Sequence, residues 1–406
     1  MTKETTSILA GKQIILGVSG GIAVYKSVEL LRLLQKQGAR IRVIMTENAK
    51  WFVGATTFEA LTGHPVCSDL FREKAGAIGH IELAQEADAV VIAPATANIL
   101  AKMAHGIADD ALSTFLLAVT APVIVCPAMN THMYENRVTQ RNLDILGKDG
   151  RFIVDPASGE LACGTTGAGR LPEADEILDR VCHFLTPKDL DGKHVLVTAG
   201  PTLEYIDPVR FVSNPSTGKM GYAIARAAEY RGASVTLVSG PTHLAAPVGV
   251  ERVQVESARE MAQAVFERVD AAHIIIKSAA VSDYRPEDAA LHKIKKDADT
   301  MALTFKKNTD ILLELGRRKK DRILVGFAAE TQDLAENALS KLNRKNLDMI
   351  VANLVNEPGT GFGVDTNRVT FFFRDGSREE LPQMDKLQVA HRLLDRVLNL
   401  GQDEPR

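Results

Sequence analysis

The stretch QIILGVSGGIAVYK, residues 13–26, decides the fold of the first half of this chain. Its apolar run at 14–18 predicts a buried strand, and a helical pattern at 23–37 follows the glycine-rich loop 19–21. Such a strand-to-helix turn directs unpaired backbone N–H groups and the positive end of a helix dipole at one spot, which favours a phosphate. A second turn of the same style lies within residues 194–221. We therefore expect two ligand sites in one chain.

Working outward from these turns, apolar runs alternate with helical patterns in both halves, which predicts parallel sheets covered by helices. Strands are expected at 14–18, 41–45, 89–93, 123–126, 194–198, 234–238, 273–276, 323–327 and 349–351. Helices are expected at 23–37, 174–185, 218–231 and 387–400. Most strand runs are continuously apolar, as expected of strands buried on both faces. The predicted fold is α/β, with two open, mainly parallel, Rossmann-like three-layer domains.

A short polar connector separates the two patterns. It spans residues 186–192 and contains Pro187 and Gly192. A chain of 406 residues exceeds the roughly 250–300 residues at which a single core stops growing. We set the domains at 1–190 and 191–406.

Composition favours a globular protein that acts on small molecules. Hydrophobic residues make up 45% and charged residues 24%, and the formal net charge of -3 gives no electrostatic reason to expect nucleic acid. No apolar run is long enough for a signal peptide or a membrane span, so a cytoplasmic protein without a membrane partner is expected. The four cysteines show no spacing typical of zinc sites or disulfide frameworks.

The first glycine loop does not have the spacing of a dinucleotide fingerprint, so NAD is weakly supported. A single terminal phosphate could still bind at Ser19, Gly20 and Gly21, or the loop could serve packing alone. Thr46 ends the second strand, and Glu47 after it leaves a ribose-binding acid open.

Two later strands end in small and polar residues, at 93–98 and 127–130, which suggests a lined crevice for a flat ligand. A lone histidine such as His80 is more often structural than catalytic. Cys163 lies in a glycine-rich segment with Arg170, and such a loop suggests a chemical role for its thiol.

Five motifs in order carry a resemblance across the first half: Ser-Gly-Gly-Ile-Ala from Ser19, Gly-His-Ile-Glu around His80, Ala-Pro-Ala-Thr-Ala-Asn to Asn98, Pro-Ala-Met-Asn to Asn130, and Ala-Cys-Gly around Cys163. Together they resemble the flavin-containing cysteine decarboxylases, among them phosphopantothenoylcysteine decarboxylase. Tyr134 and Thr165 depart from the residues frequent in that family, tryptophan and aspartate.

The resemblance implies FMN as cofactor. The residues implied to bind it are Ser19, Gly20, Gly21, Ile22, Thr46, Thr96, Asn98 and Ser113. It also implies three catalytic residues: His80 assists the oxidative half-reaction, Asn130 holds the substrate carboxylate, and Cys163 protonates the product carbon. Whether His80 acts as a base or as an electrostatic partner stays open.

The second glycine loop is not a Walker A loop, because Ser213 replaces the leading glycine and Met220 replaces the magnesium-binding hydroxyl. Lysines cluster further along, at Lys293 to Lys296 on an expected flap and at Lys341 and Lys345. A charge run is most often a solvated face. Residues 308–311 are equally a helix N-cap signature.

The second half resembles phosphopantothenate-cysteine ligase through seven motifs. In chain order they are Thr-Ala-Gly-Pro-Thr, Ser-Thr-Gly-Lys-Met-Gly, Ser-Asp-Tyr, Lys-Ile-Lys-Lys, Asn-Thr-Asp-Ile, Gly-Phe-Ala-Ala-Glu and Lys-Leu-Asn-Arg-Lys-Asn. The resemblance implies CTP as substrate, bound by Lys277, Ser278, Ala279, Asp283, Lys293, Asn308, Thr309, Asp310, Ile311, Phe327, Lys341 and Lys345. Asn214 would face 4'-phosphopantothenate. Mg²⁺ would bridge the triphosphate oxygens, and no side chain is assigned to the metal.

Taken together, the resemblances imply a bifunctional enzyme of coenzyme A biosynthesis. Its second half would join cysteine to 4'-phosphopantothenate through an acyl-cytidylate, and its first half would decarboxylate the product to 4'-phosphopantetheine. They also imply a homo-oligomer, a dodecamer of decarboxylase trimers linked by ligase dimers. The alternatives are a non-catalytic regulatory flavoprotein and a flavin prenyltransferase-like or NAD-dependent enzyme. His80, Asn130 and Cys163 together oppose the first, and the second predicts neither Cys163 on its loop nor a CTP site.

Overall fold

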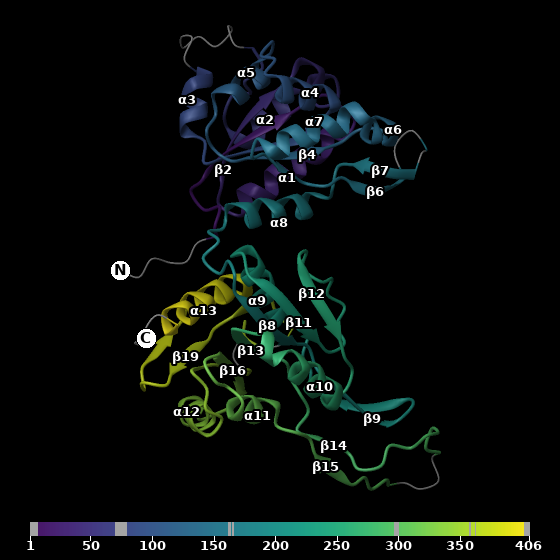
Figure 1. Cartoon of the computed structure of the whole chain (residues 1–406), viewed down its shortest axis with the longest axis vertical. Coiled ribbons are helices and arrows are strands. Elements are labelled where there is room, and N and C mark those ends of the chain that lie inside the picture. The colour runs from purple at the N-terminus through teal and green to yellow at the C-terminus, as the bar shows by residue number, and fades with distance from the viewer. Residues whose placement is uncertain are drawn as a thin grey trace. The chain divides into compact units, whose positions relative to one another are not determined.

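The computed structural model describes residues 7–69, 79–160, 164, 166–295, 300–356, 359–361 and 363–401. The chain forms two compact units, Met1–Thr186 and Pro187–Arg406, here called unit 1 and unit 2 (Figure 1). Within the described part of the chain, no helix has both the length and the apolar character that a membrane crossing requires.

Unit 1 is built on a parallel sheet of five strands in the order β2-β1-β3-β4-β5. The strands are β1 (Gln13–Val18), β2 (Arg40–Met45), β3 (Ala89–Ala95), β4 (Val123–Pro127) and β5 (Phe152–Ile153). Every residue of β1, β3 and β4 is buried, which explains their continuously apolar sequences.

Helices cover both faces of this sheet. The elements are α1 (Val24–Lys36), η1 (Glu47–Trp51), α2 (Ala55–Thr62), α3 (Gly79–Glu86), α4 (Ala97–His105), α5 (Ala111–Ala118), α6 (Thr131–Glu135), α7 (Arg137–Lys148) and α8 (Ala174–Leu185). Helix α1 buries Leu30, Leu31 and Leu34, a stripe at helical spacing, and packs against α8. A core cluster with residues such as Ile92, Leu100 and Phe115 lies beneath α4, α5 and α7. The antiparallel hairpin of β6 (Ala157–Glu160) and β7 (Thr166–Arg170) precedes α8.

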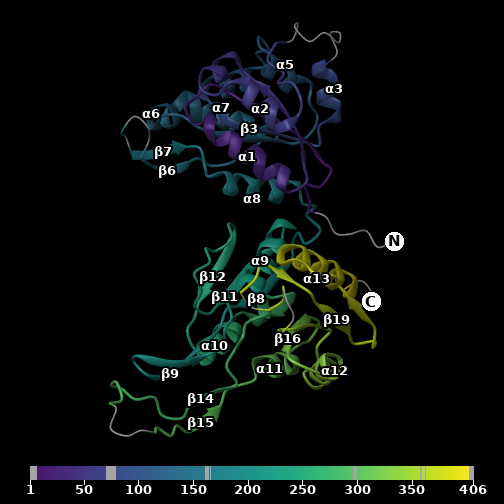
Figure 2. The ribbon, with the colours of Figure 1, turned by 180° about the vertical axis from the view of Figure 1, so that it is seen from behind.

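Unit 2 has a mixed sheet of eight strands in the order β12-β11-β8-β13-β16-β17-β19-β20, of which the last two are antiparallel. The strands are β8 (His194–Ala199), β11 (Ser234–Ser239), β12 (Val250–Gln254), β13 (Ile274–Lys277), β16 (Ile323–Glu330), β17 (Met349–Leu354), β19 (Thr370–Phe373) and β20 (Arg378–Glu380). Two small pairs stand apart from it, β9 (Leu203–Asp207) with β10 (Arg210–Ser213) and β14 (Tyr284–Pro286) with β15 (Phe305–Lys307). In Figures 1 and 2 these pairs extend from one end of unit 2. A further pair joins β18 (Thr366–Asn367) to β21 (Met384–Asp385).

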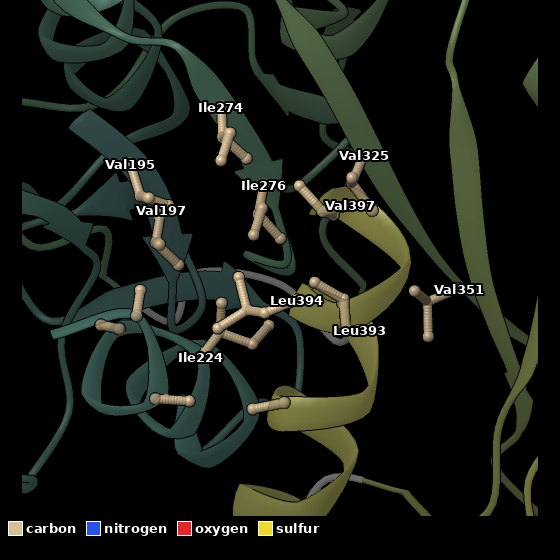
Figure 3. Close-up of a cluster of buried hydrophobic side chains, with 14 of the residues drawn as sticks. Val195, Val197, Ile224, Ile274, Ile276, Val325, Val351, Leu393, Leu394 and Val397 are labelled. Atoms are coloured by element: carbon tan, nitrogen blue, oxygen red, sulfur yellow. The ribbon is translucent and has the colours of Figure 1, made fainter. Parts of the chain in front are cut away.

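Two hydrophobic clusters fill the faces of this sheet. Helices α9 (Lys219–Tyr230) and α13 (Lys386–Leu400) cover one face, and α10 (Ala258–Arg268), η3 (Val269–Ala271), α11 (Ile311–Arg317) and α12 (Leu334–Arg344) contribute to the cluster on the other. Figure 3 shows Leu393, Leu394 and Val397 of α13 among Val197 and Ile276 of the sheet. Six strands, β12, β11, β8, β13, β16 and β17, pair in parallel with their neighbours, so their carboxyl ends meet at one edge.

The structure confirms the predicted α/β class and its open, mainly parallel sheets. Each predicted strand and helix is present, with bounds that differ by at most a few residues. The antiparallel pairs, including β6-β7, β9-β10 and β19-β20, are not among the strands expected from the sequence.

We expect Leu393→Ala to lower the free energy of unfolding of unit 2 by about 2–5 kcal/mol. The side chain is fully buried in the cluster beneath α13, so its loss leaves a cavity. Scanning calorimetry of the full chain measures this. Leu291→Ala is the matched control, because Leu291 is 88% exposed, and should change stability by less than about 0.5 kcal/mol. Equal effects from both substitutions would contradict the packing described.

Candidate functional site

A cavity of about 770 Å³ lies at the carboxyl edge of the sheet of unit 1. Its size falls in the range of about 300–1,000 Å³ that is typical of small-molecule sites. Loops that follow β1, β2, β3 and β4 line it, and the β6-β7 hairpin and the start of α4 contribute to its wall. It brings together eight of the residues singled out from the sequence: Ser19, Gly20, Gly21, Ile22, Thr46, Thr96, Asn98 and Asn130.

Ser19 holds two of these loops together. Its hydroxyl donates to the carbonyl oxygen of Pro94 at 2.8 Å and lies 3.0 Å from the hydroxyl of Thr96. The N–H of Thr96 donates back to Ser19 Oγ at 3.0 Å. Ser19 is 2% exposed, so this network is desolvated and fixes the loop after β1 against the loop after β3.

The next residues form a cradle of unused backbone donors. Among the described residues, none accepts a hydrogen bond from the N–H groups of Gly20, Gly21 or Ile22, although helix α1 begins directly after them. A Cβ at Gly20 would lie 2.5 Å from Cβ of Asn48 and 2.7 Å from its carbonyl carbon. Only glycine lets the loop approach η1 this closely. Free N–H groups at a helix N-terminus are suited to a phosphate.

Thr46 and Asn98 offer further polar groups to the cavity. The hydroxyl oxygen of Thr46 is buried and has no hydrogen-bond partner in the described chain, although the residue lines the cavity. A buried hydroxyl without a partner costs about 1–3 kcal/mol, so a ligand that bonds to it would remove this cost. Asn98, in the first turn of α4, is exposed. These donors fit a polar, phosphorylated ligand.

The β6-β7 hairpin is docked on the loop after β4. The N–H of Met129 donates to the carbonyl oxygen of Gly169 at 2.9 Å, and a Cβ at Gly169 would lie 2.3 Å from the carbonyl oxygen of Met129. A Cβ at Gly167 would lie 2.6 Å from Cγ2 of Thr131. The hairpin is therefore held beside Asn130, the N-cap of α6, whose Oδ1 accepts from the N–H of His132 at 2.9 Å.

Two cationic residues of the cavity were not singled out from the sequence. Lys26 Nζ donates to the carbonyl oxygen of Leu171 at 3.1 Å and pairs with Glu173 at 2.7 Å. This ties α1 to the chain just after β7. The partners of Lys26 lie about 145 residues away in the sequence, so no local pattern predicts this contact. The only signal for a role of Lys26 at the cavity is its place one turn after the glycine loop.

Lys102 of α4 pairs with Asp109 and Asp110, each at 2.6 Å. Burial alone would lower the pKa of Lys102, but its hydrogen bonds to the two carboxylates raise that pKa above its usual value. Lys102 therefore stays cationic on the cavity wall, beside Asp110.

One further predicted residue lies away from the cavity, and the side chains of two others are outside the described residues. Ser113 does not line the cavity: it belongs to a capping box at the start of α5, where its N–H donates to Asp110 Oδ1 at 2.8 Å. His80 lies in the first turn of α3, but its side chain is outside the described residues. Cys163 is also outside them, in the loop that joins β6 to β7.

The three cysteines that the structure describes, Cys67, Cys126 and Cys182, are all buried. Burial raises the pKa of the Cys126 thiol far above its usual value, which keeps it protonated and unreactive.

The second candidate site lies at the carboxyl edge of the sheet of unit 2. Thr198 at the end of β8 holds the loop after β13: its carbonyl oxygen accepts from Ser278 Oγ at 2.7 Å, and its hydroxyl accepts from the N–H of Ala279 at 3.1 Å. The amide of Asn214 donates to the carbonyl oxygen of Ala280 at 3.1 Å. Asn214 and the segment 278–280 are thereby brought together.

Lys277, at the end of β13, is the electrostatic centre of this site. Burial and, second, the nearby cation of Lys345 together lower the pKa of its half-buried amine to about 8. Asp310 and Asp283 oppose this shift, and Lys341 adds to it. The structure therefore gathers these five predicted residues, and Lys341 also pairs with Glu330, so three lysines and three carboxylates meet at this site.

Two contacts order the neighbours of Lys277. Lys345 Nζ pairs with Asp310 at 2.9 Å, and Asp310 caps α11 by accepting from the N–H of Leu313 at 3.0 Å. Asn308 is 8% exposed, and its amide donates to the carbonyl oxygen of Ser282 at 2.9 Å. The N-cap signature at 308–311 thus functions as a cap through Asp310.

Other predicted residues of this site are presented differently. Ile311 is buried in one hydrophobic cluster, and Phe327 packs against the other, so their side chains serve the core. Thr309 is exposed. Lys293 is exposed in the segment between β14 and β15 and is not among the charges that act on Lys277. In the described ranges, no group of three acidic, histidine or cysteine side chains could hold a metal ion.

Comparison with known proteins gives consistent matches over both units. The family model described as Flavoprotein matches residues 2–186, and the model described as DNA/pantothenate metabolism flavoprotein C-terminal domain matches residues 190–400. The chain is 51% identical to the Coenzyme A biosynthesis bifunctional protein CoaBC of Bacillus subtilis (strain 168), over 97% of this chain and 98% of that protein.

It is 48% identical to the protein of the same name from Escherichia coli (strain K12), over 96% of this chain and 97% of that protein. Among solved structures, the C-terminal domain of a coenzyme A biosynthesis bifunctional protein CoaBC is 44% identical and covers 53% of this chain and 100% of that chain, with a TM-score of 0.47.

We expect Gly20→Ala to abolish flavin binding while the chain stays folded. The added methyl would collide with the backbone of Asn48 and displace the cradle of free N–H groups. Visible absorbance of the purified chain measures bound flavin. Gly147→Ala is the control, because a Cβ there meets nothing within 4 Å, and it should bind flavin normally. Full flavin content in Gly20→Ala would show that the cradle does not hold the ligand.

Proposed function

Because this chain belongs to the family of bifunctional coenzyme A biosynthesis proteins, we propose that unit 2 joins cysteine to 4'-phosphopantothenate and that unit 1 decarboxylates the product to 4'-phosphopantetheine. The decarboxylase domain is residues 1–190, and the ligase domain is residues 191–406. The observation that carries the proposal for unit 1 is the cradle of free N–H groups that opens into the same cavity as Asn130.

FMN is the proposed occupant of the cavity in unit 1. Ser19, Gly20, Gly21 and Ile22 would hold its phosphate, because Gly20, Gly21 and Ile22 combine free N–H donors with a helix N-terminus and Ser19 fixes the loop that carries them. Thr46, Thr96 and Asn98 would bond to the rest of the cofactor, and Thr46 has the buried hydroxyl without a partner. Ser113 would act only indirectly, by fixing Asp110 at the cavity wall. When bound, the flavin supplies reversible two-electron oxidation of the substrate carbon next to sulfur.

The residues of the chain would then orient substrate and move protons. Asn130 binds the substrate carboxylate at the cavity, where loss of CO₂ from the oxidised, thioaldehyde-bearing substrate leaves an enethiolate. Cys163 donates a proton to the product carbon, and the hairpin strands that flank it in the sequence are docked beside Asn130. His80, in α3, assists the oxidative step.

In unit 2 the proposed nucleotide is CTP, with Lys277, Lys341 and Lys345 near its triphosphate. These cations offset negative charge as pyrophosphate leaves and an acyl-cytidylate forms. Lys293, exposed between β14 and β15, would add a further cation. The nucleoside would be contacted, in part through backbone groups, by Ser278, Ala279, Asp283, Asn308, Thr309, Asp310 and Ile311. Phe327 would lie beneath these residues. Asn214 would contact phosphopantothenate, and Mg²⁺ would be held by the triphosphate oxygens.

We also propose a homo-oligomer, a dodecamer that links decarboxylase trimers through ligase dimers and acts in the cytoplasm, which supplies CTP. Large apolar side chains exposed on both units support further contacts between copies. Trp51, beside the cavity loop after β2, is 87% exposed, and Phe211 of β10 is 49% exposed.

The proposal is tested by supplying the purified chain with FMN, 4'-phosphopantothenate, cysteine, CTP and Mg²⁺. We expect CMP, CO₂ and 4'-phosphopantetheine in equal amounts, measured by mass spectrometry. Cys163→Ser should still form CMP but stall after loss of CO₂, at the unsaturated thiol, because the proton donor is missing. Normal turnover by Cys163→Ser, or equal turnover with ATP in place of CTP, would contradict these roles.

We expect the affinity for CTP to fall as pH rises from about 7 to 9. Lys277 has a pKa of about 8, and a bound triphosphate would favour its cationic form and raise that pKa. Binding therefore takes up a proton, and affinity falls by up to about tenfold per pH unit in this window. Calorimetry in buffers of different ionisation enthalpy measures the proton uptake. In Lys277→Gln the affinity should be lower at pH 7 and this component of the pH dependence should vanish.

The exposed Lys148→Gln of unit 1 is the control and should keep the wild-type slope. If Lys277→Gln keeps it as well, Lys277 is not near the triphosphate.

A further inference from the structure

A second cavity, of about 810 Å³, lies at the amino edge of the sheet of unit 2, the edge opposite to the proposed nucleotide site. Residues directly before four parallel strands line it: Lys193 before β8, His273 before β13, Arg322 before β16 and Asp348 before β17. Arg374 lines it from the end of the antiparallel β19. None of the residues proposed to bind CTP lines this cavity.

Positive charge dominates its lining. The six cationic side chains are Lys193, Arg317, Lys319, Lys320, Arg322 and Arg374, and the acidic ones are Asp321 and Asp348. A cavity with this excess of cations raises the local concentration of anions.

Two of these cations are committed to the fold. Lys319 pairs with Asp348, which also accepts from the N–H of Leu324 at 2.8 Å, and Arg322 pairs with Asp270 at 2.6 Å. The side chains of Lys319 and Arg322 are each only 11% exposed. They form the floor of the cavity and keep its shape.

Arg317 pairs with Glu314 at 3.1 Å, and the other three cations are available to a ligand. Lys193 and Arg374 are exposed and have no carboxylate partner among the described residues, and Arg374 donates only to the amide oxygen of Asn346. Lys320 is 72% exposed and 3.7 Å from its nearest carboxylate, that of Asp270. His273 accepts from the N–H of His194 through Nδ1, so in the neutral ring the proton is on Nε2 as a further donor. Several charged and neutral donors thus surround one hollow.

We propose that this amino-edge cavity binds a small molecule that carries a diphosphate or longer phosphate chain. One phosphate would neutralise only part of the charge, whereas a phosphate chain can contact Lys193, Lys320 and Arg374 together. The cavity has room for a ligand of nucleotide size.

The cavity is mechanically joined to the proposed nucleotide site, and this part of the inference rests on the proposed function. Asn346 donates to the carbonyl oxygen of Gly316 at 2.9 Å and accepts from Arg374. Its neighbour Lys345 pairs with Asp310 at the other end of α11, and a Cβ at Gly316 would lie 1.9 Å from the carbonyl oxygen of Lys345. A ligand that moves Arg374 would therefore shift Lys345 beside Lys277, so the cavity is positioned to regulate the ligase.

The test titrates the full chain with inorganic tripolyphosphate, without magnesium, by calorimetry. Wild type should bind two equivalents per chain, one at each edge of the sheet. Lys193→Gln with Arg374→Gln should weaken one of them by about tenfold for each lost cation. Lys277→Gln with Lys341→Gln should weaken the other. Arg259→Gln, an exposed residue of α10 that lines neither site, is the matched control and should change nothing.

Hydrogen exchange locates the binding event. In Lys277→Gln with Lys341→Gln, tripolyphosphate should slow exchange at residues 316–323 and 345–349. Unchanged binding of tripolyphosphate in Lys193→Gln with Arg374→Gln overturns the inference. If Lys277→Gln with Lys341→Gln leaves tripolyphosphate binding unchanged while Lys193→Gln with Arg374→Gln weakens it, the result counts against the proposed nucleotide site. The amino-edge cavity is then still supported.

Discussion

Parallel pairing of buried strands is the constraint on which both sites depend. In unit 1, β1 pairs with β2 and β3 in parallel, and in unit 2, β8 pairs with β11 and β13 in the same way. Their carboxyl ends must then meet at one edge, where loops distant in sequence become neighbours. The hydrogen bonds from Ser19 to Pro94 and from Ser278 to Thr198 lock these neighbours together across about 75 to 80 residues. The residues that line each site are held in precise positions because the sheet beneath them is rigid.

Much of this could be predicted from sequence, because the determining signals are local. Continuously apolar runs such as residues 123–126 indicate buried parallel strands, and the loop 19–21 marks a phosphate cradle. Contacts between residues that are distant in the sequence have no such local signal. Nothing near Lys26 in the sequence indicates Glu173, and the run of β19 does not reveal that it is antiparallel to β17. Ser113 was selected by family resemblance, but its position is set by its capping box with Asp110.

The two proposed phosphate sites differ in their physical means of binding. The cavity of unit 1 offers neutral backbone donors at a helix terminus, and its lysines, Lys26 and Lys102, are already paired with carboxylates. The site of unit 2 gathers lysines so closely that burial and Lys345 depress the pKa of Lys277. A resident cofactor phosphate is suited to fixed dipoles. A triphosphate that must be bound, cleaved and released is better served by cations whose charge responds to the ligand.

The central claim is that each unit holds its own phosphorylated ligand at the carboxyl edge of its own sheet. Hydrogen exchange of the full chain, with FMN or CTP added separately, tests this most directly. FMN should protect residues 19–23, 96–98 and 128–130 and leave unit 2 unchanged. CTP should protect residues 277–283, 308–311 and 341–345 and leave the loops of unit 1 unchanged. Protection of the same loops by both ligands, or of neither set, would contradict the account.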